Sequence, residues 1–325
     1  MEIFAAVAGQ PPRTGTRAAP ALTQRAAMVT FITSVRHPLN ATSFQRVEAL
    51  LDRSLRSVSA QTHPDIRVIV VCNQRPNVRV ADSRIDYHIV DFPPPSEARR
   101  ASIPEELARV DKGTKQIVGF LAARAFRPEY VVFFDCDDLV NRELAAFVAA
   151  RPRRAGWYVN TGYALDMANG HVQRRAGMVR YCGTALVLNA ARLAELTGVG
   201  TQLTPRSSQD EIRAHVAPVI ITRIFGDHPF VPGFFAAHGH ALASLPFAAS
   251  AWVLGTGENL VGVRKRDVGL PATARFYEAF GIEPPDASAD PVSWTVIMRE
   301  RWSYLRSQFG FAKFRVSGFR PPPAE

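Results

Sequence analysis

Tyr130-Val-Val-Phe-Phe-Asp-Cys-Asp-Asp138 is the stretch that decides the fold expected for this chain. Its first five residues are apolar, β-branched or aromatic, which predicts a strand buried on both faces, as in a parallel sheet. Three carboxylates follow directly within four positions. Because open α/β sheets bind their ligands beyond the carboxyl ends of the strands, this stretch predicts a functional site at the end of a buried strand.

Alternating strand and helix patterns surround this stretch. Further strands are predicted at 29–34, 67–72 and 84–90. Helices are predicted after a cap at Thr42 or Ser43, ending before 61–64, and at 112–125 and 141–150. In the first of these helices the apolar residues recur at three- and four-residue steps, which is typical of a helix with one buried face. Short links between alternating strands and helices indicate an α/β protein with a doubly wound, mostly parallel central sheet and helices on both faces.

The pattern is looser after residue 155. Strands are predicted at 157–165, 171–175 and 184–188, and helices at 190–196 and 292–309. Since the body shows no internal repeat and no linker, we expect one domain over 28–315 with two halves, 28–150 and 151–315. Residues 1–27 are rich in Ala, Pro, Gly and Arg and are expected to be a disordered leader. Residues 316–325 are rich in Pro and are expected to be a flexible tail.

The composition is that of a globular protein, with 325 residues of which 47% are hydrophobic. The net charge of +10 favours acidic partners. A nucleic-acid surface would cluster basic residues with aromatics, whereas here arginine is scattered, so we expect no nucleic-acid partner. The densest basic run, Arg264-Lys265-Arg266, is interpreted as a solvated loop.

The cysteines and the apolar runs bear on the cellular compartment expected for the protein. The three cysteines form no CxxC pair, so neither a zinc site nor a disulfide framework is indicated. No apolar run approaches the roughly 18 residues of a membrane span, and the N-terminus does not have the pattern of a secretory signal. We therefore expect a cytoplasmic protein, with peripheral association at the inner face of the membrane left open; the oligomeric state is not predicted.

The acidic run at 135–138 points to a bound cation. Neighbouring carboxylates raise one another's pKa unless a positive charge neutralises them. Oxygen ligands at adjacent positions suit a hard divalent ion, Mn²⁺ or Mg²⁺, which would bridge diphosphate oxygens. The alternative is that Asp138 caps the following helix without metal, which explains one of the three carboxylates.

Two parts of the sequence together resemble glycosyltransferase family 2, which has the GT-A fold. The first is Ser54-Leu-Arg-Ser-Val-Ser-Ala-Gln-Thr-His-Pro64 followed by Arg67-Val-Ile-Val-Val-Cys-Asn73, which resembles the opening of that family. The second is Tyr130-Val-Val-Phe-Phe-Asp-Cys-Asp-Asp138, which is similar to the family's Asp-x-Asp-Asp motif. The two matches stand in the expected order and cover 29–150.

The resemblance implies the function of both halves. Residues 28–150 would form a nucleotide-binding half, and 151–315 an acceptor-binding half. The implied activity is an inverting, metal-dependent transfer of sugar from a nucleotide-diphosphate donor, with a UDP-sugar favoured, to a hydroxyl of a saccharide or other acceptor. Carried onto this sequence, Asp137 would ligate the metal, Asp135 would contact the nucleoside and share the metal site, and Asp138 would support the site.

The donor pocket implied by the resemblance lies at the ends of the first two strands. The loop after the first strand would border the base and ribose; its candidate residues are Thr33, Ser34 and Arg36. Asn73 stands where the family has a base-reading Asp, and its amide can both donate and accept. Lys115, with Lys112, would approach the diphosphate; the alternative is that both lysines are exposed helix residues.

An inverting transfer needs a carboxylate that takes the proton from the acceptor hydroxyl. The resemblance places it before a helix in the second half, where Asp227 and Asp210 are the candidates. Asp227 is favoured because its spacing from Asp137 and the segment that follows it are similar to those of the family. The structural alternative for Asp227 is a turn residue.

Further site residues are proposed on weaker patterns. His238 is a candidate third metal ligand, although a lone histidine is more often structural. Gly183 and Thr184 lie in a small-residue stretch similar to the one that borders acceptor sugars. Trp157 and Trp252 are aromatic residues on which a sugar could stack, with burial in the core as the commoner fate.

Two other functions compete with sugar transfer. A Mg²⁺-dependent nucleotidyltransferase would also be α/β, but it usually carries a Gly-rich phosphate loop near the first strand, and Ser34-Val-Arg-His-Pro-Leu-Asn40 has no glycine. The positive charge would also suit a non-catalytic binder of polysaccharide or nucleic acid.

Overall fold

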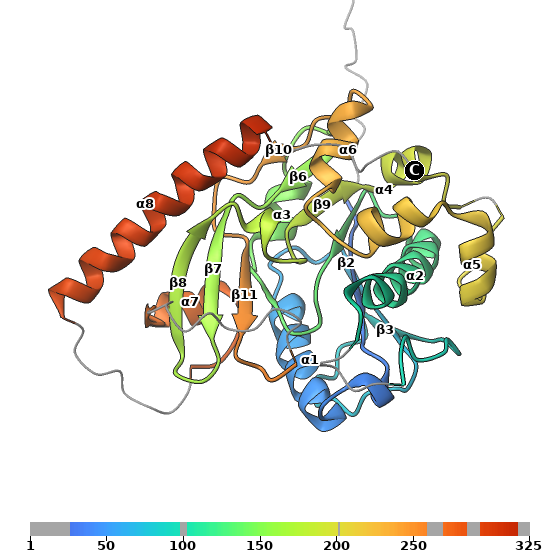
Figure 1. Cartoon of the computed structure of the whole chain (residues 1–325), viewed down its shortest axis with the longest axis horizontal. Coiled ribbons are helices and arrows are strands. Elements are labelled where there is room, and N and C mark those ends of the chain that lie inside the picture. Colours follow the sequence, from blue (N-terminus) through green and yellow to red (C-terminus); the bar gives the residue numbers. More distant parts are fainter. Residues whose placement is uncertain (1–26, 98–102, 201, 259–268, 285–292, 318–325) are drawn as a thin grey trace, which may run out of the picture.

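The predicted strand before the acidic run is present as β4 (Tyr130–Phe133), at the middle of the larger of two sheets. The computed structural model describes residues 27–97, 103–200, 202–258, 269–284 and 293–317. Over these residues the chain is an α/β protein with mixed sheets and flanking helices (Figure 1). The predicted leader up to residue 26, the basic run 264–266 and the tail beyond residue 317 lie outside the described residues.

The larger sheet has a parallel and an antiparallel part. Its strands follow the order β10-β6-β9-β4-β1-β2-β3. Besides β4 they are β1 (Val29–Ser34), β2 (Ile66–Cys72), β3 (Ile85–Ile89), β6 (Gly156–Tyr158), β9 (Leu186–Asn189) and β10 (Ala243–Ser244). The four strands of the first half run parallel, which confirms the prediction for 29–134. Strand β9 runs antiparallel to β4 and to β6.

Two helices connect the parallel strands. Helix α1 (Phe44–Ser59) joins β1 to β2, and α2 (Glu105–Ala123) joins β3 to β4. The two crossovers run in opposite directions across the sheet, so the right-handed crossover rule places the helices on opposite faces. Helix α2 packs closely: a Cβ on Gly119 would lie 2.4 Å from Cγ2 of Ile32 in β1, so only glycine allows this approach.

The smaller sheet has the order β12-β8-β7-β11-β5 and is also mixed. Its strands are β5 (Leu139–Val140), β7 (Thr161–Asp166), β8 (His171–Ala176), β11 (Ser250–Leu254) and β12 (Leu270–Pro271). Because β5 follows Asp138 directly, Asp138 caps no helix and that alternative is wrong. The helix predicted at 141–150 is shorter, α3 (Leu144–Ala149).

The strand predicted at 157–165 is in fact two strands in different sheets. Strand β6 belongs to the larger sheet and β7 to the smaller one. The chain turns between them, where the Val159 amide donates to Ala185 O at 2.8 Å and Asn160 Oδ1 accepts from the Gly177 amide at 3.2 Å. These contacts come from residues distant in sequence, which local periodicity does not reveal.

The remaining helices lie in the second half. They are α4 (Ala190–Thr197), α5 (Gln209–His215), a π-helical turn η5 (Ile220–Phe225), α6 (Val231–Ala237), α7 (Ala274–Ala279) and α8 (Trp294–Ser317). Short 3₁₀ turns are η1 (Pro38–Asn40), η3 (Arg124–Phe126) and η4 (Met178–Arg180). Helix α8 is longer than the predicted 292–309 and runs along β8 at one side of the molecule (Figure 1). Among the described residues, none of the helices combines the length and the hydropathy needed to cross a lipid bilayer.

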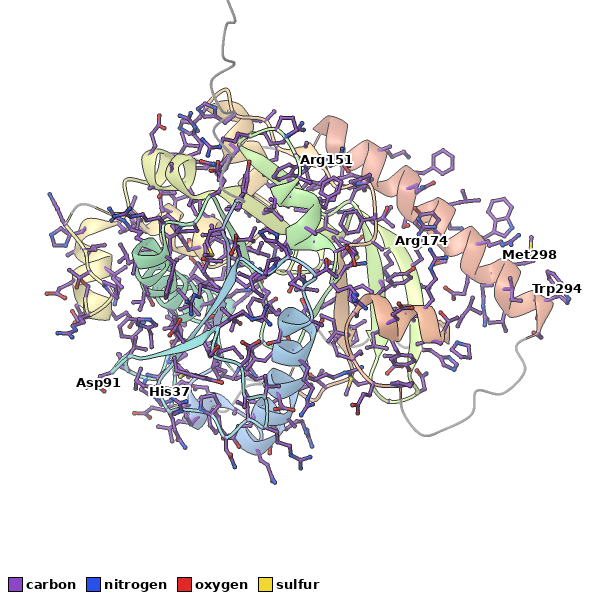
Figure 2. The ribbon with its side chains drawn as sticks, turned by 180° about the vertical axis from the view of Figure 1, so that it is seen from behind. His37, Asp91, Arg151, Arg174, Trp294 and Met298 are labelled. Carbon is purple, nitrogen blue, oxygen red and sulfur yellow. The ribbon has the colours of Figure 1, made fainter. Side chains whose placement is uncertain are left out.

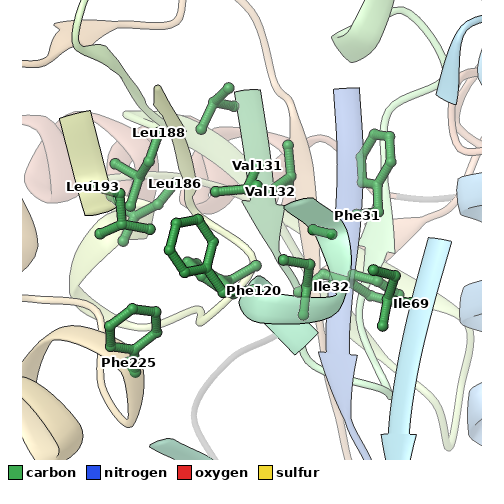
Figure 3. Packing of buried hydrophobic residues seen from close by; sticks show 14 of the residues in the cluster. Phe31, Ile32, Ile69, Phe120, Val131, Val132, Leu186, Leu188, Leu193 and Phe225 are labelled. Carbon is green, nitrogen blue, oxygen red and sulfur yellow. The ribbon is translucent and has the colours of Figure 1, made fainter. Parts of the chain in front are cut away.

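A contiguous cluster of buried apolar residues links the parallel and antiparallel parts of the larger sheet. Figure 3 shows its centre, where Ile32 of β1 and Val131 of β4 lie beside Phe120 of α2, and Leu186 of β9 lies next to them. The core therefore holds the ends of β1 and β4 in fixed positions, and the candidate site is built on those ends.

Candidate functional site

A cavity opens where the direction of chain winding reverses. From β1 the chain winds outward to β2 and β3, and then returns to β4 on the other side of β1. Open α/β sheets bind ligands at such a switch point. The cavity has a volume of about 250 Å³, and its lining includes Ser34 and Arg36 after β1 and Asp135 and Asp137 after β4. It lies at the strand end where the sequence predicts a site.

Asp138 faces the interior of the protein instead of the cavity. Its side chain is 1% exposed, and Oδ2 accepts from Thr184 Oγ1 at 2.7 Å and from Cys182 Sγ at 3.0 Å. Its Oδ1 accepts from the Val253 amide at 3.0 Å. Burial, followed by the charges of Asp137 and Asp135, raises the pKa of Asp138 well above its ordinary value. Asp138 therefore joins the segment after β4 to the residues before β9 and to β11, and its side chain is turned away from the cavity.

Asp135 is neutralised by a lysine. Lys112 on α2 forms an ion pair with Asp135 Oδ1. Burial would raise the pKa of Asp135, but the Lys112 ammonium outweighs it and lowers the pKa. Gly183 makes this arrangement possible, because a Cβ at that position would lie 2.4 Å from Asp135 Oδ2. Gly183 thus accommodates Asp135, a role that differs from the acceptor contact expected for it.

Asp137 is the second member of the acidic run that lines the cavity, beside Asp135. Burial raises the pKa of Asp137 to about 6, with the charge of Asp135 as the second cause and Arg36 opposing the shift. A cation beside Asp137 would stabilise its charged form. Asp138 and Asp135 have partners within the chain, so the expectation that all three carboxylates require a metal is wrong. Asp135 and Asp137 are the carboxylates of the run that line the cavity.

The donor atoms at this edge of the cavity fit a hard divalent ion. Asp137 and Asp135 offer carboxylate oxygens only. Over the described part of the chain there is no group of three His, Cys, Asp or Glu side chains placed to hold a metal. Mg²⁺ in particular is usually held by one or two carboxylates and completes its shell with substrate phosphates and water. Two carboxylates beside a cavity are therefore a donor set that fits such an ion.

Asp227 lines the same cavity, whereas Asp210 does not. Asp227 Oδ2 lies 3.1 Å from Arg109 Nε and 3.9 Å from Arg223 NH1, and Oδ1 accepts from the His228 amide at 2.9 Å. The Asp210 side chain is 95% exposed in the first turn of α5. Of the two candidate bases, only Asp227 is positioned to meet a ligand in the cavity.

His228 is neutral at physiological pH. Burial lowers the pKa of its imidazole to about 4, and the neighbouring Asp227 carboxylate offsets this only in part. Its Nδ1 lies 3.5 Å from Asp227 Oδ1. A neutral ring at this place adds a polar group to the cavity wall without adding charge.

Arg36 is fixed at the cavity by an acidic residue from the second half. Its NH1 lies 2.9 Å from Oε2 of Glu258, which is 4% exposed. Glu258 also accepts from the amides of Ser43 at 2.9 Å and Thr42 at 3.2 Å, at the start of α1. A carboxylate at a helix N-terminus is favoured by the helix dipole. Thr33, by contrast, is fully buried within β1 and is not part of the cavity lining.

Two residues expected to bind the nucleotide have internal partners. Lys115 is fully buried, and its Nζ lies 3.0 Å from Val35 O and 2.9 Å from the Asp111 carboxylate. It holds the loop after β1 and is not part of the cavity lining, whereas Lys112 on the same helix is. Nδ2 of the Asn73 side chain donates to Phe92 O at 2.8 Å, and Asn73 is not part of the cavity lining.

Three residues expected to bind acceptor or metal are also not part of the cavity lining. Trp157 is 2% exposed in β6, and its ring centroid lies 5.1 Å from that of Tyr130 in the core. His238 ends α6 with Nδ1 2.8 Å from Phe234 O. Thr184 is 3% exposed and is engaged by Asp138. Their buried or local partners account for all three without a ligand.

An aromatic pair lines the cavity in their place. Tyr181 and Trp252 are stacked, with ring centroids 6.1 Å apart and 16° between the planes. The sequence indicated Trp252 without distinguishing it from a core residue. It missed Arg109, because the predicted helix began only at residue 112. The three-residue spacing of Arg109 and Lys112, which puts both on one helix face, was the available signal.

The site rests on this geometry alone. No protein-family model matches the chain, and a search of curated proteins finds no match to it either.

Proposed function

We propose that this chain is a metal-dependent, inverting glycosyltransferase of the GT-A type, acting on a nucleotide-diphosphate sugar. The observation that carries the proposal is the cavity at the β1–β4 switch point, which brings together Asp137, the Asp135–Lys112 pair and Asp227. The family 2 resemblance of 54–73 and 130–138 supports the same assignment, and it favours a UDP-sugar as donor.

The donor would bind across the ends of β1 and β4. Ser34 and Arg36 border this part of the cavity and are available to the nucleoside. The Lys112 ammonium would bind the diphosphate, and the diphosphate would compete with Asp135 for this ammonium. Asp137 and Asp135 would hold Mn²⁺ or Mg²⁺, and such an ion, when bound, neutralises charge on the departing diphosphate.

The acceptor would bind beside the aromatic pair. Tyr181 and Trp252 offer ring surface against which the apolar face of a sugar can pack. Asp227 would take the proton from the attacking hydroxyl, which is the role of a general base. Arg109, 3.1 Å from Asp227, would hold that carboxylate in position.

Nucleotide binding tests the proposal most directly. Thermal unfolding of the full chain would be followed with UDP-sugars, GDP-sugars and other nucleotide-sugars, each with and without Mn²⁺. We expect one donor class to raise Tm only when metal is present, since a ligand that binds the folded state stabilises it. Asp137→Asn should abolish this shift, and Asp91→Asn, on an exposed residue outside the cavity, should retain it. A chain that no nucleotide-sugar stabilises under any metal condition would contradict the proposal.

A further inference from the structure

Helix α8 is apolar on two opposite faces. Its inner face packs on the smaller sheet: Phe311 lies against Gly177, where a Cβ would be 2.6 Å from Phe311 Cδ2, and Ser307 Oγ accepts from the Ala176 amide at 3.0 Å. The outer face carries exposed large apolar side chains at steps of three and four residues, which place them on one stripe. They are Trp294 (76% exposed), Met298 (46%), Trp302 (59%), Leu305 (43%) and Phe309 (72%).

The outer stripe is exposed to solvent along its length. Figure 2 shows Trp294 and Met298 pointing away from the body of the protein. Surface apolar residues scattered singly are normal, whereas a contiguous run of five, two of them tryptophans, marks an interaction surface. The inner face anchors the helix, so this stripe is presented on a fixed element.

The exposed charges on the described side chains of α8 are all positive. Along the side chains described for α8, the exposed charged residues are Arg299, Arg301, Arg306 and Lys313. The acidic residue Glu300 is 8% exposed and lies on the inner face, 3.3 Å from Gln173. At 100° of rotation per residue, Arg301 lies on one side of the stripe. Arg299, Arg306 and Lys313 lie on the other side.

Arg174 of the neighbouring strand β8 adds a further exposed cation. Its guanidinium lies over the ring of Tyr304 at 4.6 Å, beside α8 (Figure 2). The outer face of α8 and its border thus combine tryptophan and phenylalanine in the centre with arginine and lysine on both sides.

We propose that the outer face of α8 binds the surface of an anionic lipid bilayer. Helices that lie in the membrane interface carry aromatic and aliphatic side chains on one face, flanked by Lys and Arg that contact acidic headgroups. Tryptophan favours this interface because its ring is apolar and its N–H is polar. A symmetric contact between two copies fits less well, because it would bring two basic faces together.

This inference is independent of the proposed activity, because α8 contributes no residue to the cavity lining. If both are correct, the protein carries out its reaction at a membrane surface. The positive net charge of +10 acts in the same direction, since it attracts the whole molecule to an anionic surface.

Vesicle flotation with the full chain tests the proposal. Phosphatidylcholine vesicles would be compared with vesicles that also contain phosphatidylglycerol, at low and high salt. We expect binding to the anionic vesicles, weakened by salt, with a blue shift of tryptophan emission. The paired change Trp302→Ser and Phe309→Ser should weaken binding more than about tenfold, because it removes apolar surface that would be buried in the bilayer.

Matched variants distinguish binding by the stripe from non-specific hydrophobic binding to vesicles. Leu39 is 65% exposed on η1, so Leu39→Ser removes an equally exposed apolar side chain elsewhere and should leave binding unchanged. Arg301→Gln with Arg306→Gln should weaken binding to anionic vesicles about tenfold or more. Absence of binding to anionic vesicles, or equal binding by the Trp302/Phe309 variant, would overturn the proposal. A wild-type dimer in sedimentation velocity that becomes a monomer in this variant would also overturn it, because the stripe would then be a contact between copies.

Discussion

The Thr184 hydroxyl donates to Asp138 Oδ2 at 2.7 Å and accepts from the Asp135 amide at 3.0 Å. One side chain of the antiparallel half thus holds two members of the acidic run. It keeps Asp138 inside the protein and fixes the backbone at Asp135, from which the Asp137 side chain reaches the cavity.

Replacing Thr184 should therefore destabilise the protein. Thr184→Val keeps the shape but leaves the Asp135 amide and Asp138 without this partner, and we expect a loss of about 1–3 kcal/mol in the free energy of unfolding. Thr184→Ser, which retains the hydroxyl, should lose less. Denaturant unfolding measures both, and an unchanged stability in the valine variant would show that the hydrogen bonds are dispensable.

Replacing Lys115 should mainly lower stability, whereas replacing Lys112 should mainly lower nucleotide affinity. Lys115→Met leaves the Asp111 carboxylate buried without its cation, and breaking a buried pair is expected to cost about 3–5 kcal/mol of unfolding free energy. Lys112→Met removes a half-buried cation, so stability should change less while affinity for a nucleotide diphosphate falls. Denaturation and nucleotide titration of the two variants distinguish these outcomes. A stable Lys115 variant that no longer binds nucleotide would reverse the two roles.

Asp227→Asn should slow sugar transfer by about 100-fold or more while leaving donor affinity close to that of the wild type. The expectation follows from its place in the cavity and its proposed role on the acceptor hydroxyl. Asp210→Asn is the matched control, since that side chain is 95% exposed, and it should leave the rate unchanged. The kcat values and donor dissociation constants test this pair. Full activity of the Asp227 variant would remove it as the base.

Metal removal should abolish donor binding. A chelator is expected to eliminate the stabilisation by nucleotide-sugar without lowering the Tm of the ligand-free protein, because Asp135 and Asp138 have partners within the chain. Adding back Mn²⁺ or Mg²⁺ should restore it. Persistence of the ligand-induced shift in the chelator would show that nucleotide binding needs no divalent ion.

The Asp82–Arg84 pair predicts a pH dependence of stability. The Arg84 guanidinium, hydrogen-bonded to Asp82, lowers the pKa of that carboxyl to about 2. Since the unfolded value is about 3.9, the stabilisation is present above pH 4 and is lost as pH falls through 2. Asp82→Asn should cost about 1–2 kcal/mol of unfolding free energy at pH 7 and progressively less below pH 4. Denaturant unfolding at several pH values checks this, and a pH-independent difference would contradict it.

Much of the α/β framework was predictable from local pattern. Buried parallel strands such as β1 and β4 are recognisable because both of their faces are apolar, and a functional cavity at their ends follows from how such sheets wind. The local pattern failed at 157–165, where the chain leaves one sheet for the other at contacts made by residues 177 and 185. Asp227 lines the cavity as the sequence suggested, whereas Trp157 and His238 do not.

The sequence by itself determined that acidic side chains follow a buried strand, because apolar runs and charge are local properties. Only the tertiary structure decided what each of them does. Asp138 turns inward to Thr184, Asp135 meets Lys112, and Asp137 lines the cavity. These differences arise because partners from the segment before β9 and from α2, distant in the chain, set the burial and the charge around each carboxylate. Those surroundings govern its protonation and its chemistry.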